Sequence, residues 1–199
     1  MALISNGTTI FDNGSMASGF GGNLIFISKA TASASASIEF TSGIDSTYKE
    51  YIFYFVNIHP STDAGKFEFQ GSTDGGSSYG VTITSSAFRS RHTENDLEAY
   101  IQYNTPYDLA QSTSFQSLSS TIGNGSDQNA SGFLTLYNPS STTFVKHFLH
   151  CSNTDQHNDA TVEQFQGGYF NTTSAINAIK FQMNSGNIDA GEILLFGIN

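Results

Sequence analysis

The chain of 199 residues has a formal net charge of −10 and contains only seven basic residues, which are scattered along it. Because phosphate backbones and anionic membrane surfaces are bound by clusters of Lys and Arg, this composition argues against nucleic-acid and membrane binding. The single cysteine, Cys151, excludes an internal disulfide, and the length suits one domain with or without an arm.

Residues 1–23 differ in composition from the rest of the chain. They contain five glycines, isolated apolar residues and one charge, Asp12, so no periodic face is available for burial. Such a segment is either a solvated terminus or an extended N-terminal arm that becomes ordered against a partner. We expect the arm, because solvated tails seldom contain several large apolar residues. The expected partner-docking residues are Ile10, Phe11, Met16 and Phe20.

Strand patterns follow from residue 24 onward. Residues 24–27 form a short apolar run, residues 33–40 lead from small residues to Ile38 and Phe40, and residues 51–56 form an aromatic and β-branched run. Apolar and polar residues alternate in 67–70. The sequence Thr73-Asp-Gly-Gly76 predicts a hairpin turn, with the partner strand continuing through Tyr79, Val81 and Ile83.

Residues 90–112 are ambiguous. Thr93 to Asp96 can cap a short helix over residues 97–100, which Pro106 then limits. Tyr100, Tyr103 and Tyr107 have two interpretations, as a platform for stacking sugars or as residues that pack a long loop onto a sheet.

Later strands are expected at residues 133–137, 144–149 and 161–165, and the chain closes with a pair. Ile179, Phe181 and Met183 alternate with polar residues, whereas residues 193–196 are apolar on both faces, as in a central strand. About ten strands without a long helix predict an all-β fold, a two-sheet, jelly-roll-like sandwich. We assign residues 24–199 to this single domain and residues 1–23 to the arm.

No motif predicts catalysis, a metal or a cofactor. The metal-ligating types gather only at His147, His150, Cys151 and His157, and the first two point to opposite faces of a strand. Residues 153–159 alternate like a calcium loop but lack its glycine and closing glutamate. A nucleophile elbow and a phosphate loop are also missing. We therefore expect a protein that is not an enzyme.

Three stretches of the sequence carry a resemblance to known proteins. They are residues 44–63, with the aromatic run Tyr51-Ile-Phe-Tyr-Phe-Val56, residues 140–148, and residues 168–177 continuing to the closing Gly197-Ile198. Together they resemble small virion-associated structural proteins of marine tailed bacteriophages, many of them cyanophage-like. The resemblance covers most of the chain after Leu24 and includes no catalytic motif, so it implies a phage structural component.

The expected function is that of a capsid decoration (cement) protein, which stabilises the phage head by contacts with the major capsid protein or other virion proteins. We expect a homo-oligomer, preferably a trimer, that is located in the virion after synthesis in the host cytoplasm. The alternatives are a tail-fibre or receptor-binding module that binds glycans, and a free carbohydrate-binding module. An enzyme such as a lyase is the third alternative, and no motif supports it.

Overall fold

The computed structural model describes residues 3–5, 8–12, 15–16 and 23–198. Within the expected arm, three short strands pair antiparallel in the order β1-β2-β3, with bounds β1 Leu3–Ser5, β2 Thr8–Asp12 and β3 Ser15–Met16. These parts of the arm thus form a small local sheet. The side chains of Ile10, Phe11, Met16 and Phe20 lie outside the described residues, so their docking role stays a prediction.

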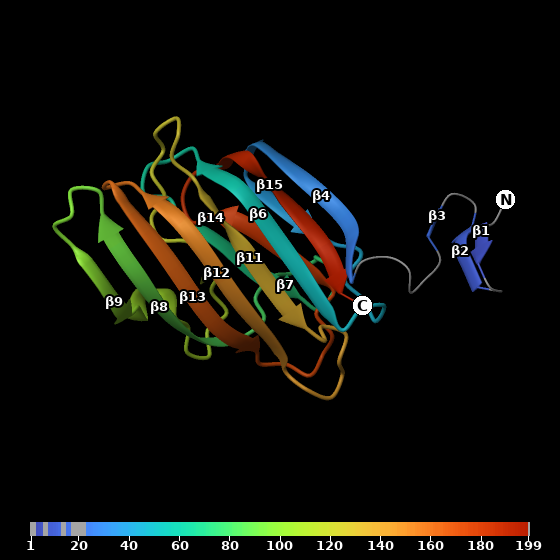
Figure 1. Cartoon of the computed structure of the whole chain (residues 1–199). Coiled ribbons are helices and arrows are strands. Elements are labelled where there is room, and N and C mark those ends of the chain that lie inside the picture. The colour runs from blue at the N-terminus through green and yellow to red at the C-terminus, as the bar shows by residue number, and fades with distance from the viewer. Residues whose placement is uncertain (1–2, 6–7, 13–14, 17–22, 199) are drawn as a thin grey trace.

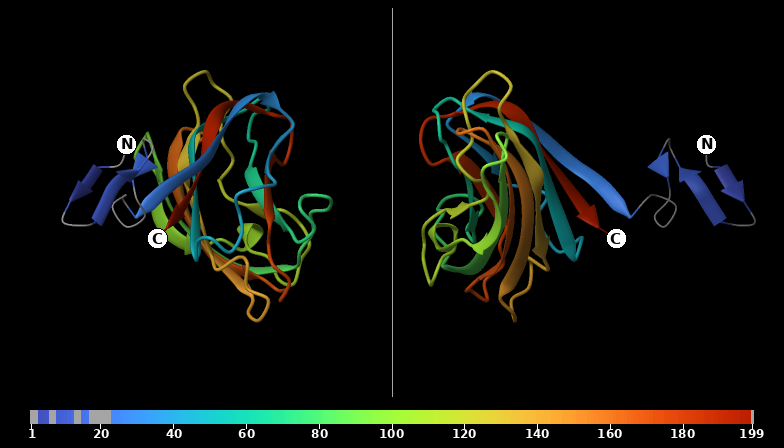
Figure 2. Two further views of the ribbon diagram at one scale, coloured as in Figure 1. Left: turned by 90° about the vertical axis from the view of Figure 1, so that its right-hand side faces the viewer. Right: turned by 60° about the vertical axis from the view of Figure 1, so that its left-hand side comes forward.

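The rest of the chain forms two antiparallel sheets that pack as a sandwich, which confirms the predicted all-β class (Figures 1 and 2). The large sheet has the order β4-β15-β6-β11-β12-β13-β8-β9 and the small sheet the order β10-β7-β14-β5. The bounds in the large sheet are β4 Leu24–Ser35, β6 Glu50–Pro60, β8 Ile83–Thr93, β9 Ala99–Tyr103, β11 Ala130–Tyr137, β12 Lys146–Gln156, β13 Ala160–Phe170 and β15 Ile188–Ile198. Those in the small sheet are β5 Ser37–Phe40, β7 Phe67–Ser72, β10 Gln116–Ser117 and β14 Ala178–Met183.

The core lies between the two sheets and is rich in phenylalanine. Successive side chains of a strand point to opposite faces, so Phe53 and Phe55 of β6 both point inward, and both are fully buried. They meet residues of the small sheet edge to face: the ring centroids of Phe53 and Phe181 are 5.2 Å apart, and those of Phe55 and Phe67 are 5.3 Å apart. Such pairs add about 0.5–1.5 kcal/mol each beyond their buried area.

The closing strand of the chain is central, as its composition predicts. β15 pairs with β4 on one side and with β6 on the other. Ile193 and Leu195 are fully buried in the core, while Leu194 and Phe196 point to the opposite face of the sheet.

The helix considered over residues 97–100 is wrong. Residues from Ala99 onward form β9, which pairs with β8 through a tight connection. Thr93, expected as a helix cap, instead accepts a hydrogen bond from the Glu98 amide on its hydroxyl at 3.0 Å, and the Thr93 amide donates to the Glu98 carbonyl at 3.0 Å. These two bonds close a hairpin. The hydrogen bonds gained by pairing β9 with β8 stabilise the chain more than a short helix limited by Pro106 would.

The expected hairpin at residues 73–76 is also wrong, although the turn itself exists. β7 belongs to the small sheet and β8 to the large one, so the two strands are not paired. The Asp74 carboxylate accepts hydrogen bonds from the hydroxyls of Ser72 and Ser78, both at 2.6 Å, and these bonds lower its pKa to about 2. The turn therefore directs the chain from one sheet to the other.

Leu195→Ala should destabilise the sandwich by roughly 2–5 kcal/mol, because it leaves a cavity in the core at a central strand. Leu194→Ala is the matched control, since its side chain lies on the other face of the same strand, and it should cost less than about 1.5 kcal/mol. Urea denaturation of both variants measures the difference. Equal losses would show that β15 does not separate a core face from a solvent face.

Candidate functional site

The outer face of the large sheet carries the main candidate site. Strand register places Leu194 opposite Tyr54, Tyr54 opposite Phe133, and Phe133 opposite Cys151. The same row continues across the sheet with Phe165, Phe88 and Tyr103. A neighbouring row contributes further apolar side chains. We call the two rows together the apolar band, whose members are Phe26, Ile52, Tyr54, Phe88, Tyr103, Phe133, Leu149, Cys151, Phe165, Leu194 and Phe196.

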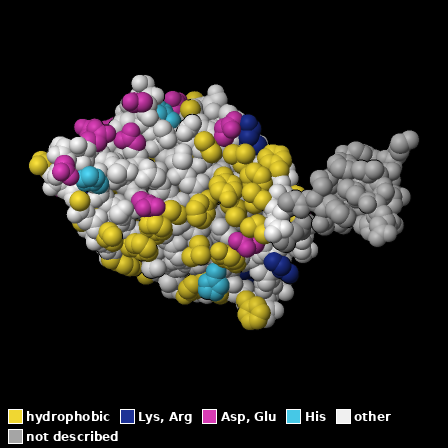
Figure 3. All heavy atoms as spheres, in the orientation of Figure 1, with side chains coloured by type: hydrophobic (Ala, Val, Ile, Leu, Met, Phe, Trp, Pro, Cys, Tyr) yellow, Lys and Arg dark blue, Asp and Glu magenta, His cyan; other side chains and the backbone are white. Residues whose placement is uncertain are grey.

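The apolar band is exposed although its aromatic members contact one another. Phe88 stacks on Phe165 with centroids 4.9 Å apart, and Phe26 meets Phe196 edge to face at 5.6 Å. Phe26 nevertheless remains 56% exposed and Leu149 51% exposed. Figure 3 shows hydrophobic side chains spread across this face of the molecule. Contiguous apolar surface of this kind marks interaction sites in most proteins.

Charged residues border the apolar band and do not interrupt it. Glu192 pairs with Lys29 across β15 and β4, with Oε1 and Nζ 2.6 Å apart. Glu163 lies in the adjacent row, opposite Asn153 and two residues before Phe165, which pairs with Cys151. Burial in the sheet surface raises the pKa of the Cys151 thiol, and the nearby Glu163 carboxylate raises it further. The thiol is therefore kept protonated and behaves as a small apolar group.

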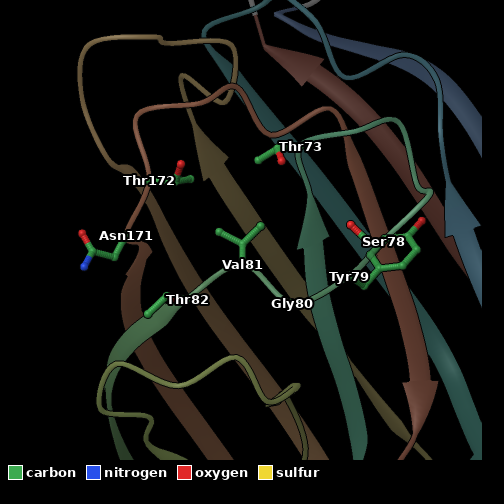
Figure 4. A pocket seen from close by; sticks show the side chains of 8 residues that line it. All are labelled: Thr73, Ser78, Tyr79, Gly80, Val81, Thr82, Asn171 and Thr172. Carbon is green, nitrogen blue, oxygen red and sulfur yellow. The ribbon is translucent and has the colours of Figure 1, made fainter.

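A second feature is an open polar cleft at one end of the sandwich, of about 550 Å³ (Figure 4). It lies between the segment before β8, the end of β7 at Thr73 and the end of β13 at Asn171. Tyr79 at its rim donates a hydrogen bond from its hydroxyl to Glu39 at 3.2 Å. Burial and the Glu39 charge raise the pKa of Tyr79 to about 12, so its phenol is a structural group and not an acid at neutral pH.

The interior beneath residues 104–122 is polar, unlike the phenylalanine core. Gln116 and Gln166 both donate from Nε2 to the carbonyls of Tyr107 and Ser117, at distances of 2.6–3.1 Å. Arg91 donates from Nε to Gln156 at 2.9 Å and pairs with Glu98. These buried hydrogen bonds fasten the long connection, which includes the short edge strand β10 of the small sheet, onto the inner face of the large sheet.

His150 lies where the polar and apolar parts of the interior meet. It is fully buried, and its ring stacks on Phe55 with centroids 5.8 Å apart and an interplanar angle of 18°. Burial lowers its pKa to about 3, while the neighbouring Gln166 acts weakly in the opposite direction. The imidazole is thus neutral at physiological pH, and it is closed off from any substrate.

The predicted split of the histidines is confirmed. On β12, His147 points outward and is exposed, whereas His150 points into the core. His157 accepts or donates a bond to the Thr121 hydroxyl at 3.0 Å in the following turn. Within residues 23–198 and the described parts of the arm, no three His, Cys, Asp or Glu side chains converge as metal ligands.

The prediction of a tyrosine platform for stacking sugars is wrong. Tyr103 faces outward in the apolar band, Tyr107 is buried beneath the long connection, and Tyr100 lies beside Arg89, whose Nη2 is 3.3 Å from its hydroxyl. The three rings therefore share no surface. The apolar band was not predicted from the sequence, although residues 51–56 are apolar at both odd and even positions. Successive side chains of a strand point to opposite faces, so one of the two sets of side chains is exposed unless both faces of the sheet are covered.

Comparison with protein-family models, curated proteins and solved structures finds no match for this chain. Within the part of the chain that the structure describes, no helix is long and apolar enough to cross a membrane. The function must therefore be argued from the site itself, above all from the apolar band.

We expect the free energy of unfolding to fall as the pH decreases from about 6.5 to about 3. In this window an unfolded chain protonates His150 and the folded chain does not, so acid favours unfolding by up to about 1.4 kcal/mol per pH unit. His150→Gln should remove most of this slope in urea denaturation series at several pH values. His147→Gln, on the outward side of the same strand, should retain it, and parallel curves for all three proteins would contradict the prediction.

Proposed function

We propose that this protein is a structural component of a phage virion and works by protein–protein contacts. The observation that carries the proposal is the apolar band, an exposed face that crosses seven strands from β15 to β9 in a single row. Its phenyl, alkyl and thiol groups favour burial against another protein surface.

Within this class we propose the role of a capsid decoration protein that stabilises the phage head. Support comes from the resemblance of residues 44–63, 140–148 and 168–177 to virion-associated proteins of marine tailed phages. In this proposal residues 1–23 dock on the major capsid protein or another virion protein through their apolar side chains. The protein is a homo-oligomer, for which the sequence alone favours a trimer, and it reaches the virion from the host cytoplasm.

A tail-fibre or receptor-binding module is the second candidate, and one observation favours it. A shallow hollow of about 460 Å³ on the outer face is lined by Tyr137, His147 and Tyr169 around Gly167. The His147 and Tyr169 rings meet edge to face at 5.9 Å. Gly167 has no side chain beside them, and an added Cβ would come within 3.3 Å of Leu149 Cδ2. Aromatic rings around such a space can stack on the apolar face of a sugar ring.

Deletion of residues 1–23 should leave the melting temperature of the sandwich nearly unchanged and should lower its loading onto virions several-fold. The physical reason is that the core cluster of the described residues runs from Ala32 to Leu195, and in this proposal the arm docks on a partner. Circular dichroism melts and quantitative mass spectrometry of purified virions measure the two effects. Normal loading of the truncated protein would contradict a docking role for the arm.

Copy number and sugar binding separate the two candidates. A decoration protein should be present in high copy across the capsid, and a tail module in low copy. Tyr169→Ala provides the matched test of the hollow: loss of binding on a glycan array, with virion loading retained, would support the tail module. Absence of any glycan binding by the wild-type protein would leave the decoration role as the supported function.

A further inference from the structure

We propose that the apolar band is the contact surface between two copies of this chain, which pack face to face about a two-fold axis. The inference deepens the proposed function and rests on it only in treating the outer face as a protein contact. It identifies the partner at this face as a second copy, so the proposed homo-oligomer is a dimer in place of the trimer expected from the sequence. It leaves the docking of residues 1–23 on other virion proteins as a separate contact.

The size of the face fits a stable dimer. Eight strands about 4.8 Å apart span roughly 34 Å, and three rows of side chains about 6.8 Å apart along the strands cover roughly 20 Å. The two rows of the apolar band, with Thr135 and Gly167 between their members, make up about two thirds of this area. The third row contributes Leu24, Tyr137 and Tyr169, and Glu50 and His147 in the same row form part of the polar border. The resulting ~700 Å² is close to the ~800 Å² that each partner buries in a standard interface.

The shape of the apolar band suits a copy of itself. A row of side chains that crosses a sheet can pack against the same row of a second copy when a two-fold axis lies in the plane of the interface. Such a contact is isologous, because both copies use the same surface. Twisted sheets pack face to face about 10 Å apart with strands inclined by about 30°. Because β11 and β12 are the middle strands of the eight, Phe133 and Cys151 fall near the axis, each close to its twin.

Charge also selects this face for self-association. Two copies with a net charge of −10 each repel one another, so they can approach closely only where the surface is uncharged. The members of the apolar band carry no formal charge at neutral pH, and Lys29 neutralises Glu192 at its border. Along the row from Leu194 to Tyr103, hydroxyl groups are carried only by Tyr54 and Tyr103, and the Tyr103 hydroxyl already donates to Asp108. A glycan would therefore find few hydrogen-bonding groups there, whereas a second apolar row does not need them.

The first experiment compares oligomeric state in the full-length chain. Sedimentation equilibrium of the wild type should give twice the chain mass of 21.4 kDa. Phe133→Glu and Phe88→Glu place a charge in the interface, and each should weaken the dimer at least tenfold while the chain still folds and melts cooperatively, because both side chains point away from the core. The melting temperature should fall only by the part that dimerisation contributes, and the difference from the wild type should shrink on dilution. Phe144→Glu is the matched control: Phe144 is 70% exposed outside the apolar band, and its variant should remain dimeric.

The second experiment uses Cys151 as a reporter of the two-fold axis. At alkaline pH, where the Cys151 thiol ionises in spite of its raised pKa, a short bis-maleimide should crosslink the wild-type protein into a covalent dimer, because in the proposed dimer the two thiols lie near the axis. Phe88→Glu should abolish the crosslink and Phe144→Glu should retain it. A wild-type protein that remains monomeric at its highest soluble concentration overturns the inference, as does a trimer that persists in Phe133→Glu.

The two proposals fail separately. A chain lacking residues 1–23 should still dimerise, and loss of virion loading by a dimeric protein would concern only the arm. Conversely, normal loading of monomeric Phe133→Glu onto virions would overturn the dimer as the functional unit while leaving a virion role supported. A wild-type dimer that is present in no virion preparation would support this inference and contradict the proposed function.

Discussion

The contact between phenylalanines of the two sheets is the interaction on which the rest of the structure depends. Phe53 and Phe55 of β6 pack edge to face against Phe181 and Phe67 of the small sheet. This contact decides which side of β6 is inside. Because β6 pairs with β15 and β11, and each of these pairs further, the same choice of face spreads through antiparallel register to every strand of the large sheet. The apolar band is the other consequence of that choice.

The two sheets cover each other only in part, and the uncovered part is built differently. The large sheet has eight strands and the small sheet four, and opposite β8 and β13 the small sheet contributes its two-residue edge strand β10. Residues 104–122, which include β10, fill this space with buried glutamines whose amides donate to backbone carbonyls, since most of this connection lies outside a strand ladder and its polar groups are satisfied by side chains. The neutral His150 stands at the boundary, between an aromatic ring and these amides.

The proposed function rests on the face that the core leaves outside. Ile52 and Tyr54 are largely apolar, like their inward neighbours, and a monomer gains nothing from exposing the two rows to which they belong. Covering the row with a second copy would bury it and would keep the charged border, including the Lys29–Glu192 pair, in contact with water. In the proposed assembly the sheet joins copies and the N-terminal segment joins the virion, so the two contacts use separate parts of the chain.

The sequence by itself determined where most strands lie and which residues of a strand share one face. Alternation placed His147 and His150 on opposite faces, and the two-sided apolar run at 193–196 marked a central strand; both follow from the two-residue period of extended backbone. Only the tertiary structure decided which side of residues 51–56 is exposed, because both sides are apolar and the choice depends on rings contributed by β7 and β14. It also decided that Thr93 closes a hairpin with Glu98 and that the Asp74 turn links two sheets, since each outcome depends on pairing partners distant in the chain.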